Sequence, residues 1–145
     1  MDALTRLLIK DACRELVLRS AACADAHDPR GLAALFTEDG TLVRPDGSTL
    51  QGRSAIEAAY RARPAERITR HLVTGSLTDI ESAELAHVHS SVLLWSGSTT
   101  DAEGPQGRPA HPRQLVGSFD DRCVLTPQGW RIAQRRAAFS LHSGN

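Results

Sequence analysis

Residues 24–40 read ADAHDPRGLAALFTEDG, and this stretch decides how the N-terminal part of the chain folds. Asp28 is a good helix N-cap, and Pro29 suits the first position of a helix. The pair therefore ends one helix and begins another, which we predict from Pro29 to about Phe36. Gly40 closes this short helix. A carboxylate at such a break between helices can also do chemistry.

Helical spacing marks two further segments. From Leu4 to Ala24 apolar residues recur on one face with charges on the other, which predicts an amphipathic helix. Ser54 and Glu57 have the spacing of a capping box and predict a third helix that ends before Pro64. Residues 41–44 read as a strand, with a turn over 45–48.

The second half of the chain reads as sheet. Its apolar and β-branched segments, bounded by turn formers, predict strands over 68–80, 85–95, 114–125 and 130–139. Because the helices come first and short turns join the strands, we predict an α+β fold with an antiparallel sheet and helices on one face. Residues 96–113 are rich in Gly, Pro, Ser and Thr, and we expect a flexible loop that is either a mobile lid or a disordered tip.

The composition narrows the class of protein. With 145 residues and 41% hydrophobic content, the chain fits one domain over residues 1–145. Its 17 basic and 17 acidic side chains cancel, so neither nucleic acid nor anionic lipid is an expected partner. Cys13, Cys23 and Cys123 lack metal-site spacing and indicate buried thiols in a reducing compartment. No apolar run approaches the roughly 18 residues of a membrane span, so we expect a cytoplasmic protein.

His71 is the main candidate for chemistry. On a strand it shares a face with Thr69, Val73 and Leu77, which indicates a buried or half-buried imidazole. If the Asp28 carboxylate meets one ring nitrogen, it fixes the tautomer and leaves the other nitrogen as a general base. Such a pair suits removal of a proton next to a carbonyl, followed by loss of a leaving group or by ring closure. The alternatives are that Asp28 only caps its helix and that His71 is a satisfied core histidine.

These motifs, together with the closing strand over 130–139, resemble the SnoaL-like branch of the nuclear transport factor two-like, or cystatin-like, superfamily. The pattern is nearest to its Asp-His dehydratases such as scytalone dehydratase, and the matching segments are His27-Asp28 and residues 70–75. The resemblance covers residues 16–139. It implies a cone-shaped barrel of a strongly bent, mostly antiparallel sheet with three N-terminal helices around one pocket. It also implies catalysis by Asp28 and His71 without a cofactor, and a homodimer.

The resulting functional hypothesis is a cofactor-independent lyase, of the dehydratase type, or a cyclase. Its substrate would be a hydrophobic, oxygenated small molecule. The alternative is a non-catalytic module of the same fold that binds small molecules or dimerises. The candidate substrate-binding residues are His27, Tyr60, Trp95 and Arg122. Arg135 and Arg136 point to opposite faces of a strand, so at most one of them faces the pocket.

Two further groups of residues raise hypotheses about a metal and about the dimer. His87 and His89 share a strand face, but no third ligand has a claim, and we expect no metal. The outer face of the sheet is the expected dimer interface. Its candidate residues are Leu85, Val88, Val92, Leu94, Val116 and Val124.

Overall fold

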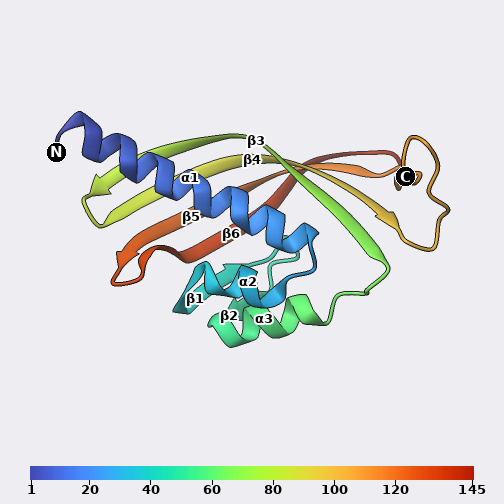
Figure 1. Cartoon of the computed structure of the whole chain (residues 1–145), viewed down its shortest axis with the longest axis horizontal. Helices are drawn as coiled ribbons and strands as arrows, with labels where there is room; N and C mark the ends of the chain where they lie inside the picture. The colour runs from blue at the N-terminus through green and yellow to red at the C-terminus, as the bar shows by residue number, and fades with distance from the viewer.

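The computed structural model describes all 145 residues and contains three helices and six strands. In chain order these are α1 (Ala3–Asp25), α2 (Pro29–Ala34), β1 (Phe36–Val43), β2 (Thr49–Gln51), α3 (Arg53–Arg61), β3 (Arg67–Ser82), β4 (Leu85–Ser98), β5 (Gln114–Thr126) and β6 (Gly129–Ser143). Figure 1 shows α1 lying along the long strands, with α2, α3 and the short strands at its C-terminal end.

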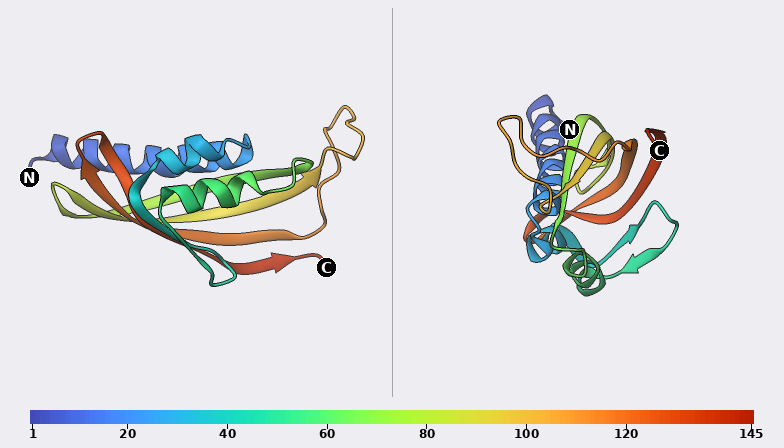
Figure 2. Two further views of the ribbon diagram at one scale, coloured as in Figure 1. Left: turned by 90° about the horizontal axis from the view of Figure 1, so that it is seen from below. Right: turned by 90° about the vertical axis from the view of Figure 1, so that its right-hand side faces the viewer.

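The six strands form one curved sheet in the order β2-β1-β6-β5-β4-β3. Every neighbouring pair is antiparallel except β1 and β6, which run parallel. The three helices lie on one face of this sheet (Figure 2). The predicted α+β fold, with a mostly antiparallel bent sheet and three helices, is therefore confirmed.

The hydrophobic core lies between α1 and the inner face of the sheet. Helix α1 contributes Ile9, Cys13, Leu16 and Val17, all nearly inaccessible to solvent, because they recur at helical spacing on one face. They pack with side chains from β1, β5 and β6, including Phe36, Cys123 and Ile132. Cys13 and Cys123 are free thiols inside this core.

Several predicted boundaries are wrong. Strand β1 begins at Phe36 instead of Thr41, because the fully buried Phe36 pairs with Ile132 of β6. The three-residue β2 was not predicted, because so short a segment carries no readable alternation. Helix α3 is capped by Gly52 without any side-chain hydrogen bond, so the predicted capping box of Ser54 and Glu57 does not form.

A bulge in β3 changes which residues share the face of His71. Val73 pairs with Val92 and Gly75 with Ser91, so Thr74 is an extra residue in β3. An extra residue reverses the alternation of side chains beyond it. Leu77 is consequently 74% exposed, and the prediction that it shares a face with His71 is wrong.

The connection between β4 and β5 lies at the far end of the long strands (Figure 1). Strand β4 takes up Ser96–Ser98 of the predicted loop, so the connection itself covers 99–113. It is fixed to the strand ends by the amides of Thr99 and His111, which donate to the carbonyls of Glu66 and Ser96 at 2.9 and 2.8 Å. No helix of the chain is long and apolar enough to cross a membrane.

Candidate active site

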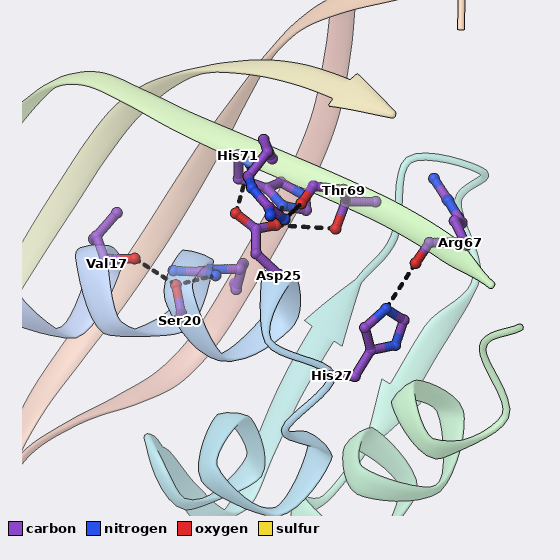
Figure 3. Close-up of polar contacts among 9 residues, drawn as sticks. Val17, Ser20, Asp25, His27, Arg67, Thr69 and His71 are labelled. Carbon is purple, nitrogen blue, oxygen red and sulfur yellow. Dashed lines mark hydrogen bonds and ion pairs between the residues drawn. The ribbon is translucent and has the colours of Figure 1, made fainter. Parts of the chain in front are cut away.

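Asp25 and His71 form a hydrogen-bonded pair between the last residue of α1 and the first half of β3. The Nδ1 of His71 lies 2.6 Å from Oδ1 of Asp25 (Figure 3). The same Oδ1 accepts a hydrogen bond from the Thr69 hydroxyl at 2.9 Å, and Oδ2 accepts one from the His71 amide at 2.9 Å. Because both carboxylate oxygens are held, the orientation of the imidazole is fixed as well.

The surroundings of Asp25 keep its carboxylate ionised. Burial raises its pKa, but hydrogen bonds from the ring and amide of His71 and from Thr69 outweigh burial, so the pKa of Asp25 is lowered. An ionised carboxylate only accepts, so Nδ1 of His71 carries a proton, and in the neutral imidazole the lone pair is on Nε2. Nε2 makes no hydrogen bond to the protein, and the His71 side chain is 13% exposed.

The predicted pairing of Asp28 with His71 is wrong. Asp28 caps α2, where its Oδ1 accepts a hydrogen bond from the Gly31 amide at 2.9 Å. Gly31 permits this because a β-carbon there would lie 2.2 Å from Oδ2 of Asp28. One signal in the sequence favoured Asp25: a carboxylate in the last turn of a helix opposes the helix dipole, which suggests a role outside the helix.

A cavity of about 300 Å³ opens beside His71, between the helices and the inner face of the sheet. Its apolar lining comes from α1, α2, β4, β5 and β6 and includes Ala21, Ala24, Leu32, Val92, Leu94, Phe119, Ala137 and Phe139. Tyr60, predicted to bind substrate, also lines it. Half of the 20 lining residues are hydrophobic and most of the lining surface is apolar, and such a surface with converging polar groups is typical of a small-molecule site.

Arg135 lies at the inner end of this cavity. Its Nε and Nη2 donate to the two oxygens of Asp121 at 2.7 and 2.8 Å, and Nη1 donates to Ser20 Oγ at 2.9 Å. The guanidinium also lies 4.0 Å from the centre of the Phe119 ring. Burial lowers the pKa of Arg135, but the charge of Asp121 and its hydrogen bonds, with smaller contributions from Tyr60 and Cys123, together raise the pKa by more, so the buried side chain stays charged.

Three of the predicted substrate-binding residues, His27, Trp95 and Arg122, lie outside the lining of this cavity. His27 is bonded through Nε2 to the Arg67 carbonyl at 2.7 Å and so ties the α1–α2 turn to the start of β3 (Figure 3). Trp95 and Arg122 are exposed on the outer face of the sheet, because their neighbours Leu94 and Asp121 are the ones that point inward. The sequence alone did not determine which of the alternate side chains of each strand point toward the helices.

The alternation of side chains along these strands also contradicts part of the predicted dimer interface. Val88, Val92 and Leu94 are buried under the helices, at 2, 5 and 7% exposure, and cannot form an outer interface. Leu85, Val116 and Val124 are half-buried. The homodimer itself stays a prediction.

His87 and His89 each pair with one carboxylate on the outer face. His87 Nε2 lies 2.9 Å from Glu81, and His89 Nδ1 lies 2.6 Å from Asp120. Nowhere in the chain do three or more His, Cys, Asp or Glu side chains gather closely enough to hold a metal ion.

The lowered pKa of Asp25 predicts a loss of stability in acid. A carboxyl whose pKa is lower in the folded state stabilises the fold above its ordinary value of about 4, and this contribution is lost as the pH falls through the folded-state value. We expect the free energy of unfolding, measured with urea at pH 5 and pH 3, to fall less in Asp25→Asn than in the wild type. Equal losses in both proteins would contradict this.

Comparison with known proteins agrees with this architecture. A family model described as a SnoaL-like domain matches residues 5–136. A candidate scytalone dehydratase from Novosphingobium aromaticivorans superposes with a TM-score of 0.83 at 23% identity, covering 99% of this chain and 92% of its own. An NTF2-like protein with a cystatin-like fold from the same organism has a TM-score of 0.74 at 26% identity, with 94 and 86% covered.

A hexachlorocyclohexane dehydrochlorinase, LinA-type3 from Novosphingobium barchaimii, is also similar, with a TM-score of 0.81 at 14% identity and coverage of 98% of this chain and 93% of its own. No curated protein sequence matches the chain. At such identities the dehydratase and the dehydrochlorinase show the fold alone, whereas the family model spans most of the chain. The chain therefore belongs to the SnoaL-like domain family.

Proposed function

We propose that the protein is a cofactor-independent lyase that eliminates a small leaving group, as a dehydratase does, from a hydrophobic, oxygenated small molecule. The observation that carries this proposal is the 2.6 Å contact between Asp25 and Nδ1 of His71, which leaves Nε2 without a partner beside a mostly apolar cavity. A fixed imidazole with one free nitrogen is a good general base.

The proposed step is a proton transfer coupled to elimination. Nε2 of His71 takes the proton from the carbon next to a carbonyl, and the C–H electron pair forms the new C=C bond. The bond from the β-carbon to its oxygen substituent breaks, and the His71 proton passes to that oxygen, which leaves as water. Asp25 stabilises the transient imidazolium through Nδ1 and does not itself need to take up the proton.

Elimination is favoured over cyclisation by two of the structural neighbours, which are named as a dehydratase and a dehydrochlorinase. The apolar walls suit a hydrophobic substrate body and exclude competing water. A cyclase would use the same base, because ring closure also begins with a proton removed next to a carbonyl.

The proposed base can be tested by following the exchange of the α-proton, next to the carbonyl, with deuterium from the solvent. This test does not require the natural leaving group to be known. Cyclic β-hydroxyketones are incubated with the protein in D₂O, and NMR records loss of the α-proton signal together with formation of the unsaturated ketone. We expect exchange or elimination with the wild type and neither with His71→Gln. As a control, His89→Gln, which changes an exposed histidine on the outer face, should behave as the wild type. Equal exchange in His71→Gln and wild type would contradict the proposed base.

The alternative is a non-catalytic module that binds small molecules in the same cavity. It is favoured by the low aromatic content, 4%, which leaves few rings to shape a catalytic site. It predicts ligand binding without exchange of any α-proton in wild type. The homodimer and the cytoplasmic location are proposed with either function.

A further inference from the structure

Three arginines from separate parts of the chain gather at the open end of the cavity. Arg44 follows β1, Arg63 follows α3, and Arg67 begins β3, and all three line the cavity. The open end is identified by exposure, since Arg67 and Asp46 are exposed there while Ser20 and Arg135 at the other end are buried.

None of these arginines has a carboxylate partner. Five other arginines of the chain form ion pairs: Arg14, Arg19, Arg61, Arg108 and Arg135. By contrast, the side chains of Arg63 and Arg67 make no hydrogen bond or ion pair to the protein, and Arg44 donates only to Ser48 Oγ, at 2.9 Å. Most of the hydrogen-bond donors of the three guanidinium groups are therefore free.

The single acidic side chain in the cavity lining does not neutralise them. Asp46 uses one carboxylate oxygen to accept hydrogen bonds from the amide and hydroxyl of Ser48, at 2.8 and 2.6 Å. Three positive groups against this one negative group leave an excess of two positive charges at the open end. In a chain whose formal net charge is zero, this excess is a local feature of the cavity.

Arg63 is the most constrained of the three. Its guanidinium lies 4.2 Å from the centre of the Tyr60 ring, which holds it over the cavity lining. Burial lowers the pKa of Arg63, and the charges of Arg67 and Arg44 lower it further, against the opposing effects of Tyr60 and Asp25. Keeping a partly buried cation unpaired next to two like charges costs free energy, which a bound anion would recover.

We propose that the open end of the cavity binds a carboxylate, carried by a ligand whose apolar body fills the cavity toward His71 and Phe119. Guanidinium groups recognise carboxylates with paired hydrogen bonds, which suits Arg63 and Arg67 with their free donors. This inference rests on the proposed function in taking the cavity as the substrate site, and it narrows the substrate class to hydrophobic carboxylic acids.

The test measures binding by calorimetry with compounds that have no leaving group, so turnover plays no part. The probes are 2-naphthoate and 2-naphthamide, which share size and shape and differ in charge. We expect 2-naphthoate to bind about tenfold or more tightly than 2-naphthamide, in keeping with charge-assisted hydrogen bonds. Equal affinity for the two compounds, or no binding of 2-naphthoate at millimolar concentration, would overturn the inference.

Variants locate the effect at the cavity opening. We expect Arg63→Gln and Arg67→Gln each to weaken 2-naphthoate binding about tenfold and to leave 2-naphthamide binding unchanged. Arg70→Gln is the matched control, because it removes the same charge from the same strand but from an exposed arginine outside this cavity. Arg67 is exposed, so its variant tests the inference even if the partly buried Arg63 is needed for folding. If Arg70→Gln weakens binding as much as Arg67→Gln, the attraction is diffuse and the inference is wrong.

A third probe, 2-naphthyl phosphate, distinguishes the chemistry of the anion. Weaker binding than that of 2-naphthoate supports a carboxylate site, and tighter binding would reassign the opening to phosphate esters. The outcome is separable from the catalytic proposal: preserved α-proton exchange with no preference for 2-naphthoate refutes only the carboxylate site, while preference without exchange refutes only the lyase.

Discussion

Replacing Asp25 with asparagine is expected to lower kcat/KM for the true substrate by about a thousandfold or more while the protein stays folded. The amide of Asn can present its NH₂ group to Nδ1, which would reverse the tautomer of His71 and remove the lone pair from Nε2. The uncharged amide would also cease to stabilise the imidazolium. Steady-state kinetics measures the loss of kcat/KM, and a circular dichroism spectrum shows whether the variant stays folded.

Asp28→Asn is the matched control for this experiment. Asn is as good an N-cap as Asp, and Asp28 contacts the Gly31 amide and not the imidazole. We expect its kcat/KM to stay within a few-fold of wild type. If Asp28→Asn loses activity and Asp25→Asn keeps it, the catalytic pair is not the one described here. Because the proposed mechanism uses Asp25 and His71 as one unit, Asp25→Asn combined with His71→Gln should be little worse than either single variant.

Replacing Asp121 with asparagine is expected to be the most damaging single change to stability among the polar residues of the sheet. Arg135 is 4% exposed, and both oxygens of Asp121 accept its hydrogen bonds. Removing the negative partner leaves a buried cation uncompensated, which typically costs about 3–5 kcal/mol. Urea unfolding followed by circular dichroism measures the change in the free energy of unfolding.

The adjacent residue supplies the control. Asp120 is also paired, with His89 at 2.6 Å, but both side chains are more than half exposed to solvent on the outer face. An exposed pair contributes little, so Asp120→Asn should change the free energy of unfolding by less than about 1 kcal/mol. Similar small losses for both variants would show that other groups compensate Arg135 when Asp121 is neutral.

Local sequence patterns were enough to predict the succession of elements, apart from the three-residue β2. The helical spacing of α1, the Asp28-Pro29 break and the four long strands are each encoded over at most 23 consecutive residues, where propensity and periodicity act directly. Together they predicted an α+β fold with helices before a mostly antiparallel sheet. They also singled out His71, because a histidine expected on the same strand face as Val73 needs a polar partner.

The tertiary structure decided which residues meet. Asp25 and Asp28 are three residues apart, and only the path of the chain after α1 brings one to His71 and leaves the other as a helix cap. The direction in which the alternate side chains of β4, β5 and β6 point placed Arg135 in the cavity and Trp95 and Arg122 outside it. The alternation along a strand predicts which residues share a face of the sheet. Only the packing of the helices decides which of the two faces they cover.

The arginines at the cavity opening are the clearest example of a feature that the tertiary structure decided and the local sequence did not predict. Arg44 follows β1, Arg63 follows α3 and Arg67 begins β3, and nothing in their local sequence distinguishes them from the paired arginines of the chain. The sequence by itself determined the helices and all strands but β2, with their order, because these depend on interactions between near neighbours. The tertiary structure decided the hydrogen-bond partner of His71, the face that lines the cavity and the charge at its opening, because these depend on contacts between residues far apart in the chain.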